Sequence, residues 1–323
     1  MRLRPAEAAM HHARPGPRCC LVAWLIGLWL AAWPGLVQAA YSCNVVAQRV
    51  NLLAEVFAAQ TVVQSLTVTC NRAPGDASTL TYRIVAGDGN HLNGAQRRVR
   101  RELTINNFLN YGLVRATAAG NAPTCSATTN WRGTGANVIS GTLNFGTALS
   151  QSVTWNYCVR AAASSFANAG IYTDSVLLTL RYPNTGAGQL NTAPLDIQVG
   201  VQTSCLLDKP LPGLTVAYTS LQPMAAILNT SVLLRCSTGH PWTAGLLPDP
   251  ASAAAPVTTL TNQSLLGLTY SVQVSPASGT GTGNAAGGGQ AVTLGVTVPG
   301  GQAGICSMGS CTASNTHVLV ITF

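Results

Sequence analysis

The sequence predicts an all-β protein built from two tandem β-sandwich domains. Only 8% of its residues are charged, while Thr, Ser, Asn, Gly, Val and Leu dominate, which is typical of short strands joined by polar turns. Segments with an apolar residue at every second position recur along the chain, and the same succession of segments occurs twice. Strands at this spacing with one apolar face favour a sandwich over a parallel sheet.

Residues 1–40 have the features of a signal peptide. Two arginines precede an apolar run from Cys19 to Trp33, and Val37-Gln38-Ala39 fits a cleavage site. The run is too short to span a bilayer. We therefore expect a chain that is exported through the periplasm of a bacterium and begins near Tyr41, with either Met1 or Met10 as the start.

Eight cysteines follow this leader, four in each half of the chain. An even number in an exported protein implies disulfides. Four cysteines allow three pairings per half, and similar spacing of the first pair in each half favours Cys43–Cys70, Cys125–Cys158, Cys205–Cys236 and Cys306–Cys311. A zinc site is the alternative, but the closest pair has only His317 nearby and lacks a fourth ligand.

Strands are predicted wherever the period-two alternation is clear. In the first half these segments are residues 66–70, 80–86, 103–105, 111–116, 139–145, 152–159 and 171–182. Residues 51–59 fit either a short helix or an irregular loop. In the second half, residues 232–236 resemble 66–70, and residues 268–274 resemble 80–86, so two copies of one unit are the simplest explanation.

Domain boundaries follow from the turn-rich run at residues 183–189. We expect a first domain over residues 41–182, a linker over 183–194 and a second domain over 195–323. Leu195, Ile197, Val199 and Val201 alternate, and this segment either completes the first domain or opens the second.

The last eight residues predict a strand that is buried on both faces, because they are aliphatic and contain neither Gly nor Pro. The backbone groups of a buried strand must be paired on both sides. No further strand follows, so either an earlier segment or another polypeptide fills the place beside it. We expect the second sandwich to lack its last strand.

Charge is concentrated in the first half, where residues 41–190 carry a net charge of +6 and residues 191–323 carry −1. The run Arg97-Arg98-Val99-Arg100-Arg101 is the densest cluster. Arg97, Arg98, Arg100 and Arg101 are candidates for binding an anionic surface, and the alternative is a solvated loop that protects a sheet edge.

Signals for catalysis are weak. The acidic residues are scattered, the three histidines outside the leader are far apart in sequence, and there is no Gly-x-Ser-x-Gly motif. The glycine-rich residues 279–289 lack a lysine and a following helix, which a phosphate-binding loop requires. We expect no enzyme and no cofactor.

Several motifs of the chain resemble those of the spore coat protein U family. They are the pair Cys43 and Cys70, Asn110-Tyr111-Gly112-Leu113, Asn130-Trp131-Arg132-Gly133, Gly170-Ile171-Tyr172-Thr173-Asp174-Ser175-Val176 and, in the second half, Cys236-Ser237-Thr238-Gly239-His240-Pro241-Trp242. This family covers the pilins and two-domain tip subunits of archaic, Csu-type chaperone–usher pili. The second half departs from the family by lacking the Trp-Gly segment.

The resemblance implies Ig-like, pilin-like sandwiches and a set of partners. These are a periplasmic pilus chaperone, an outer-membrane usher and a next pilin subunit, which donates a strand along an open edge. We expect that edge to be bordered by Val318, Val320 and Phe323. Only about two residues precede Cys43, too few to donate a strand, so we expect a position at the pilus tip on the cell surface.

Apolar loops are the second candidate for surface binding. Phe57 and Phe166 are expected at the pole of the first domain that faces away from the second, where exposed apolar side chains mark binding sites; the alternative is that both are core residues. The sequence thus predicts a tip adhesin that binds an abiotic or host surface and supports biofilm formation, with no nucleic-acid partner. A structural, coat-like or minor fimbrial subunit is the alternative, and a secreted hydrolase is a third reading.

Overall fold

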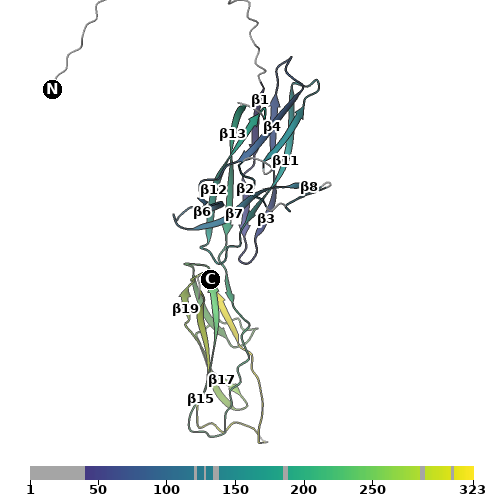
Figure 1. The fold of residues 1–323 in the computed structure, drawn as a ribbon. Coiled ribbons are helices and arrows are strands. Elements are labelled where there is room, and N and C mark those ends of the chain that lie inside the picture. The colour runs from purple at the N-terminus through teal and green to yellow at the C-terminus, as the bar shows by residue number, and fades with distance from the viewer. Residues whose placement is uncertain are drawn as a thin grey trace, which may run out of the picture.

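The computed structural model describes residues 41–119, 122–126, 129–133, 138–184, 188–283, 288–306 and 309–323. These residues form two all-β domains arranged end to end (Figure 1). The expected leader lies outside the described residues. No helix within them could cross a membrane.

The described residues of the first domain contain thirteen strands. They are β1 (Ser42–Ala47), β2 (Val50–Ala54), β3 (Gln60–Asn71), β4 (Thr79–Ala86), β5 (Leu92–Asn93), β6 (Gln96–Arg101), β7 (Phe108–Arg115), β8 (Thr117–Ala119), β9 (Ala122–Thr124), β10 (Ile139–Asn144), β11 (Ser150–Ala161), β12 (Gly170–Tyr182) and β13 (Gln189–Val201). Eleven of these strands belong to one sheet that forms both layers of a sandwich, and β8 and β9 form a separate two-stranded sheet. One layer has the order β1-β3-β11-β7, the other contains β10-β4-β12-β13-β2, and β6 connects β7 to β12.

The second domain repeats this plan with fewer strands. They are β14 (Cys205–Leu207), β15 (Ala226–Cys236), β16 (Pro241–Leu247), β17 (Thr259–Leu265), β18 (Leu268–Ser275), β19 (Ser278–Thr280), β20 (Gln290–Val298) and β21 (Val318–Thr322). One layer has the order β14-β15-β20-β18-β17 and the other β19-β16-β21.

The period-two pattern places apolar side chains in a separate core in each domain. In the first domain Val68, Ile84 and Leu178 are fully buried, and in the second Val232, Trp242 and Val292 form part of the core. The burial of these side chains on alternate positions is what the sequence pattern predicts for half-buried strands.

The boundary between the domains differs from the one expected. Residues 189–201 are not a linker and a start of the second domain; they form β13, which pairs antiparallel with β12 along its whole length and parallel with β2. Leu195, Ile197 and Val199 are buried in the first core. The turn-rich residues therefore connect two strands of one domain, which extends to Val201.

Two further local expectations were wrong. Residues 103–105 form turns between β6 and β7 instead of a strand, and the arginine run, expected as a loop on one reading, is strand β6. Residues 51–59 contain β2 and a bend, without helix.

Candidate functional site

The edge of β21 is the open feature of the second domain. β21 pairs antiparallel with β16, from Thr243 opposite Thr322 to Leu247 opposite Val318. Among the described residues, no strand pairs with its other edge. The corresponding strand of the first domain, β12, pairs with β4 on one side and with β13 on the other.

Burial along these two strands reflects the difference in pairing. In β12 the alternate residues Val176, Leu178 and Leu180 are completely buried. In β21, Leu319 and Ile321 pack against the second core but remain half-buried. The two strands occupy equivalent places, and the greater exposure is found in the one that, among the described residues, is paired on one side alone.

The groove residues differ in part from those expected. Side chains of a strand alternate between its faces, and Leu319 and Ile321 are the ones that pack on the core. Val318 and Val320 therefore lie on the opposite face, while Phe323, 48% exposed, follows the alternation of Leu319 and Ile321. Strict alternation, counted back from Phe323, predicts from sequence that Leu319 and Ile321 share a face.

Hydrogen bonds fix the chain where β21 begins. His317 Nε2 lies 2.8 Å from the Tyr270 hydroxyl, and its Nδ1 lies 2.8 Å from the Pro248 carbonyl oxygen. Asn315 donates to the same hydroxyl at 2.8 Å. The start of β21 is therefore fixed by the Tyr270 side chain and by the Pro248 backbone carbonyl.

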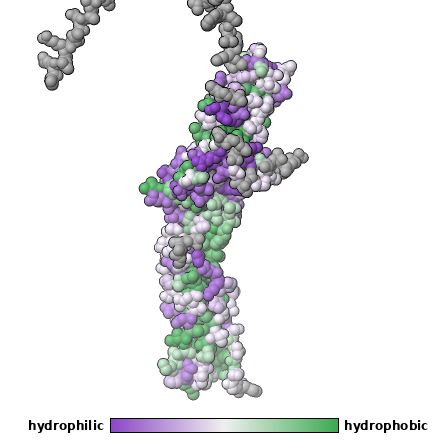
Figure 2. Space-filling view, in the orientation of Figure 1, coloured by the Kyte–Doolittle hydropathy of each residue, from purple (hydrophilic) through white to green (hydrophobic). Residues whose placement is uncertain are grey.

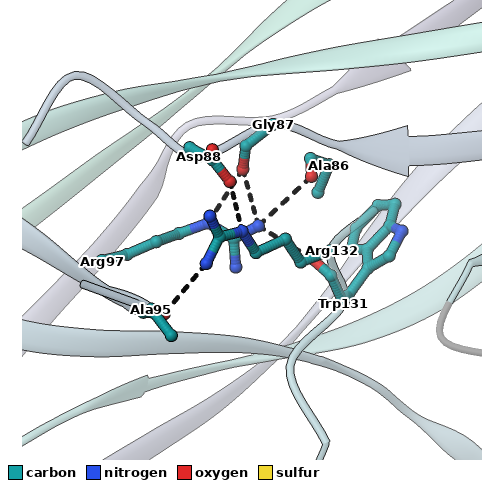
Figure 3. A network of polar contacts seen from close by, with 7 residues as sticks. All are labelled: Ala86, Gly87, Asp88, Ala95, Arg97, Trp131 and Arg132. Carbon is teal, nitrogen blue, oxygen red and sulfur yellow. Dashed lines mark hydrogen bonds and ion pairs between the residues drawn. The ribbon is translucent and has the colours of Figure 1, made fainter. Parts of the chain in front are cut away.

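The arginine run does not present four equivalent charges. Side chains of β6 alternate between the two faces of the strand, and Arg97 lies on the inward face with Val99. Arg97 is therefore only 2% exposed. Its guanidinium donates to the carbonyl oxygens of Gly87 at 2.6 and 2.9 Å, Ala86 at 3.2 Å and Trp131 at 2.8 Å (Figure 3). Arg97 is therefore a structural residue, and its expected role in surface binding was wrong.

A second arginine and an aspartate complete this network. Arg132 forms an ion pair with Asp88 and donates to the Ala95 carbonyl at 3.4 Å, beside Arg97 (Figure 3). Burial lowers the pKa of Arg97, and the nearby Tyr111 and Asp88 oppose that shift. The network ties β6 to the connection after β4.

Tyr111 and Asp174 form a buried pair near Arg97. The Tyr111 hydroxyl donates to Asp174 at 2.5 Å, and the Asn90 backbone N–H donates to the same carboxylate at 2.7 Å. Burial, and then Asp174, raise the pKa of Tyr111. The resemblance motifs that contain Tyr111, Trp131 and Asp174 thus meet in the core, where they have a structural role.

The remaining arginines of β6 reach the surface to different extents. Arg98 lies over the Phe108 ring, 4.1 Å from its centroid. Arg100 is exposed and Arg101 is half-buried. Only these three can contribute to an anionic contact.

Phe57 and Phe166 lie at the junction of the domains, and not at the outer pole. Phe166 is 2% exposed and its ring packs edge-on against Phe57, which is 70% exposed. The Phe166 carbonyl accepts hydrogen bonds from the Thr238 backbone N–H at 2.9 Å and hydroxyl at 3.1 Å. The expectation was wrong because β13 adds a pass through the first domain and reverses the pole at which the chain leaves it.

The four disulfides are those expected: Cys43–Cys70, Cys125–Cys158, Cys205–Cys236 and Cys306–Cys311. Cys43 lies directly opposite Cys70 in the β1–β3 pair, and Cys205 directly opposite Cys236 in the β14–β15 pair. These two bridges occupy the same place in both domains.

Metal-ligating side chains do not gather in the described part of the chain. No group of three or more His, Cys, Asp or Glu residues there could hold a metal ion.

Comparison with protein families gives a match in the first half of the chain. The family model for the Spore Coat Protein U domain matches residues 34–179, and its match ends within β12, before β13. No curated protein matches the chain.

Three solved structures are similar to the chain. The chaperone–tip adhesion subunit complex CsuC–CsuE, from archaic Csu pili of Acinetobacter baumannii, is 9% identical with a TM-score of 0.47 and covers 87% of this chain and 100% of that one. The CupB6 tip adhesin of Pseudomonas aeruginosa is 10% identical with a TM-score of 0.34, over 88% and 96%. The CssB subunit of enterotoxigenic Escherichia coli, complemented with a donor strand from CssA, is 13% identical with a TM-score of 0.30, over 49% and 97%. The family match thus covers most of the first domain and none of the second.

Proposed function

We propose that the chain is a two-domain adhesin subunit of a chaperone–usher pilus. Its second domain accepts an extended strand from the next subunit along β21, and its first domain is the part that contacts a surface. The observation that carries the proposal is the unpaired edge of β21 with its half-buried Leu319 and Ile321. Such an edge is a template for strand addition and a liability when left bare.

The partners follow from this edge. Before assembly a periplasmic chaperone covers it, an outer-membrane usher then directs the exchange, and the next subunit supplies the final strand. The first domain needs no strand from another chain, because β13 already fills the equivalent place beside β12. It therefore extends away from the site of strand addition, which supports a position at the pilus tip.

A self-complemented variant tests strand acceptance. A second copy of residues 183–201 is fused after Phe323, so that the copy of β13 follows β21 as β13 follows β12. Three aliphatic side chains of the copy would enter the groove, and we expect at least about 2 kcal/mol of added stability, since each buried aliphatic side chain contributes about 1.5–3 kcal/mol. The matched control carries Ser at the copies of Leu195, Ile197 and Val199. Equal thermal midpoints for the two fusions would contradict strand acceptance.

Deletion of the first domain tests adhesion. Removing residues 41–203 while keeping the leader is expected to leave pili assembled and to abolish attachment to surfaces. Unchanged attachment by intact pili would instead favour a structural minor subunit without adhesive specificity.

An ionic contribution to adhesion is assigned to Arg98, Arg100 and Arg101. We expect a variant with Arg98→Ser and Arg100→Ser to attach less at low salt and to equal the unmodified chain at high salt, since exposed charges are screened by salt. An equal loss at both salt concentrations would contradict the ionic mode. Arg97 is left unchanged in this test because it is buried.

A further inference from the structure

The two domains are repeats of one unit, so most strands of the first have a counterpart in the second. The strand pairings and chain order give the correspondences: β1 with β14, β3 with β15, β4 with β16, β7 with β18, β10 with β19, β11 with β20 and β12 with β21. β6 likewise corresponds to β17. Among the described residues, β2, β5, β8, β9 and β13 have no counterpart, and β13 is the one that pairs with β12, the counterpart of β21.

The first domain contacts the second through two connections at one pole, which we call the junction pole. These connections are residues 55–59, before β3, and residues 162–169, between β11 and β12. They are held together by hydrogen bonds from the Ser164 N–H to the Glu55 carbonyl at 2.7 Å and from the Ser165 N–H to the Val56 carbonyl at 3.1 Å.

The second domain sits directly on the junction pole. Beside the hydrogen bonds from Thr238 to Phe166, a shallow cavity of about 320 Å³ lies between the domains. Phe57 and Phe166 line it from the first domain, and Leu206 and the Asp208–Arg235 ion pair line it from the second. The junction pole is therefore a docking surface with aromatic residues for a following sandwich.

The second domain has the same two connections at its far pole, the end away from the first domain. They are residues 218–225, which lead into β15, and residues 299–306, which follow β20. They are linked in the same way: the Leu221 N–H donates to the Gln302 carbonyl at 2.8 Å, and the Gly301 N–H donates to the Gln222 carbonyl at 2.7 Å.

These connections expose three large apolar side chains, which we call the far-pole residues: Leu221 at 65%, Met224 at 77% and Ile305 at 73%. Green, apolar surface is visible at the lower end of the second domain in Figure 2. The far-pole residues occupy the connections of the second domain that correspond to the connections carrying Phe57 and Phe166 in the first. Apolar residues gathered on one end of a domain mark an interaction site.

The direction of β13 identifies the occupant. β13 runs antiparallel to β12, ends at Val201 on the junction pole and leads within four residues to Cys205, the first residue of β14. A strand that added to β21 in the same orientation would leave the groove at the far pole. The folded body that follows such a strand would then lie against the far-pole residues.

We propose that Leu221, Met224 and Ile305 form a docking surface for the folded body of the subunit whose strand fills the edge of β21. That body is a second sandwich of the same kind. It contacts the far-pole residues through its first strand and through the turn after its second strand, which are the parts that Leu206 and Thr238 represent at the junction pole. This inference rests on the proposed function and adds a second contact to it.

Site-specific photocrosslinking in pili purified from the source bacterium tests both contacts separately. The photoreactive residue p-benzoylphenylalanine replaces Phe323 in one full-length variant and Ile305 in a second. A third variant carries it at Leu177, an exposed position on β12, as the matched control. Folding is preserved because all three side chains are substantially exposed. Crosslinked peptides are identified by mass spectrometry.

The expected result is that Phe323 captures the N-terminal segment of a polypeptide and Ile305 captures the folded body of the same polypeptide. Capture at Phe323 with none at Ile305 above the Leu177 control, or capture of a different polypeptide at Ile305, overturns the docking surface and leaves strand acceptance standing. Capture at Ile305 alone overturns the shared partner and with it the inference. Capture at neither position overturns strand acceptance, and the docking surface falls with it.

Discussion

Most of the buried polar groups around Arg97 are hydrogen-bonded, although its Nη1 has no partner among the described residues. Its guanidinium is fixed by three backbone carbonyls, while the nearby Asp174 accepts from Tyr111 and from the Asn90 backbone. A buried charge is tolerated only when such partners compensate its lost hydration. The cluster therefore fixes the orientation of β6. This orientation in turn decides that Arg98 and Arg100 point away from the core.

Replacing the buried arginine is expected to cost far more than replacing an exposed one. Arg97→Met leaves the carbonyls of Ala86, Gly87 and Trp131 without their donor, and we expect a loss of about 3–5 kcal/mol in the free energy of unfolding. Arg100→Ser should change it by less than about 0.5 kcal/mol. Urea unfolding monitored by tryptophan fluorescence measures both, and similar midpoints for the two variants would contradict the assignment.

Alkaline stability depends on Tyr111. Its pKa is raised in the folded state, first by burial and then by Asp174, so its contribution is complete below the ordinary tyrosine pKa of about 10 and is lost as the pH rises above it. Tyr111→Phe is expected to reduce the fall in stability above about pH 10, and to cost about 1–3 kcal/mol at pH 7 because buried Asp174 loses a donor. Urea midpoints between pH 8 and 11 test this; parallel curves for both proteins would exclude the role of Tyr111.

At the scale of elements, β13 and β21 show what alternation can and cannot predict. The alternation of Leu195, Ile197 and Val199 predicts a strand with one buried face. It does not predict whether this strand pairs with a strand of the first domain or of the second. Turns within a domain and linkers between domains share the same Pro, Gly and Asn composition. Residues 183–189 therefore fit a domain boundary as well as a turn between two strands of one domain. Pairing of β13 with β12 depends on tertiary contacts, which the local sequence pattern does not specify.

Strand β13 is expected to stabilise the first domain through its inward face. Ile197→Ala removes a side chain that is 1% exposed and should cost about 2–4 kcal/mol in the unfolding of that domain. Leu190→Ala, at an exposed position of the same strand, is the matched control and should cost less than about 0.5 kcal/mol. Calorimetry resolves the effect if the transition of the first domain moves and that of the second does not; movement of the second transition alone would place β13 in the wrong domain.

At the scale of the whole molecule, the repeat and the cysteine pairing were predictable, while the orientation of the poles was not. Cys43 and Cys70 end segments that recur as Cys205 and Cys236, so spacing alone related the halves. Which pole of the first domain meets the second depends on whether the number of strand passes before the linker is even or odd. One additional strand, β13, exchanges the poles and moves Phe166 from the expected surface into the junction.

The junction contact of Phe166 is expected to limit the motion between the domains. Phe166→Ala removes a buried ring that packs on Phe57. Without this ring, the Phe166 carbonyl, which accepts both hydrogen bonds from Thr238, is held less firmly in position. Because intrachain domain interfaces of modest size permit relative motion by default, loss of this anchor should broaden the distribution of interdomain distances, measured between spin labels on β3 and β15. Phe57→Ala, which truncates an exposed ring beside the same contact, should broaden it less. Equal broadening by both variants would contradict the larger role assigned to the buried ring and its hydrogen-bonded carbonyl.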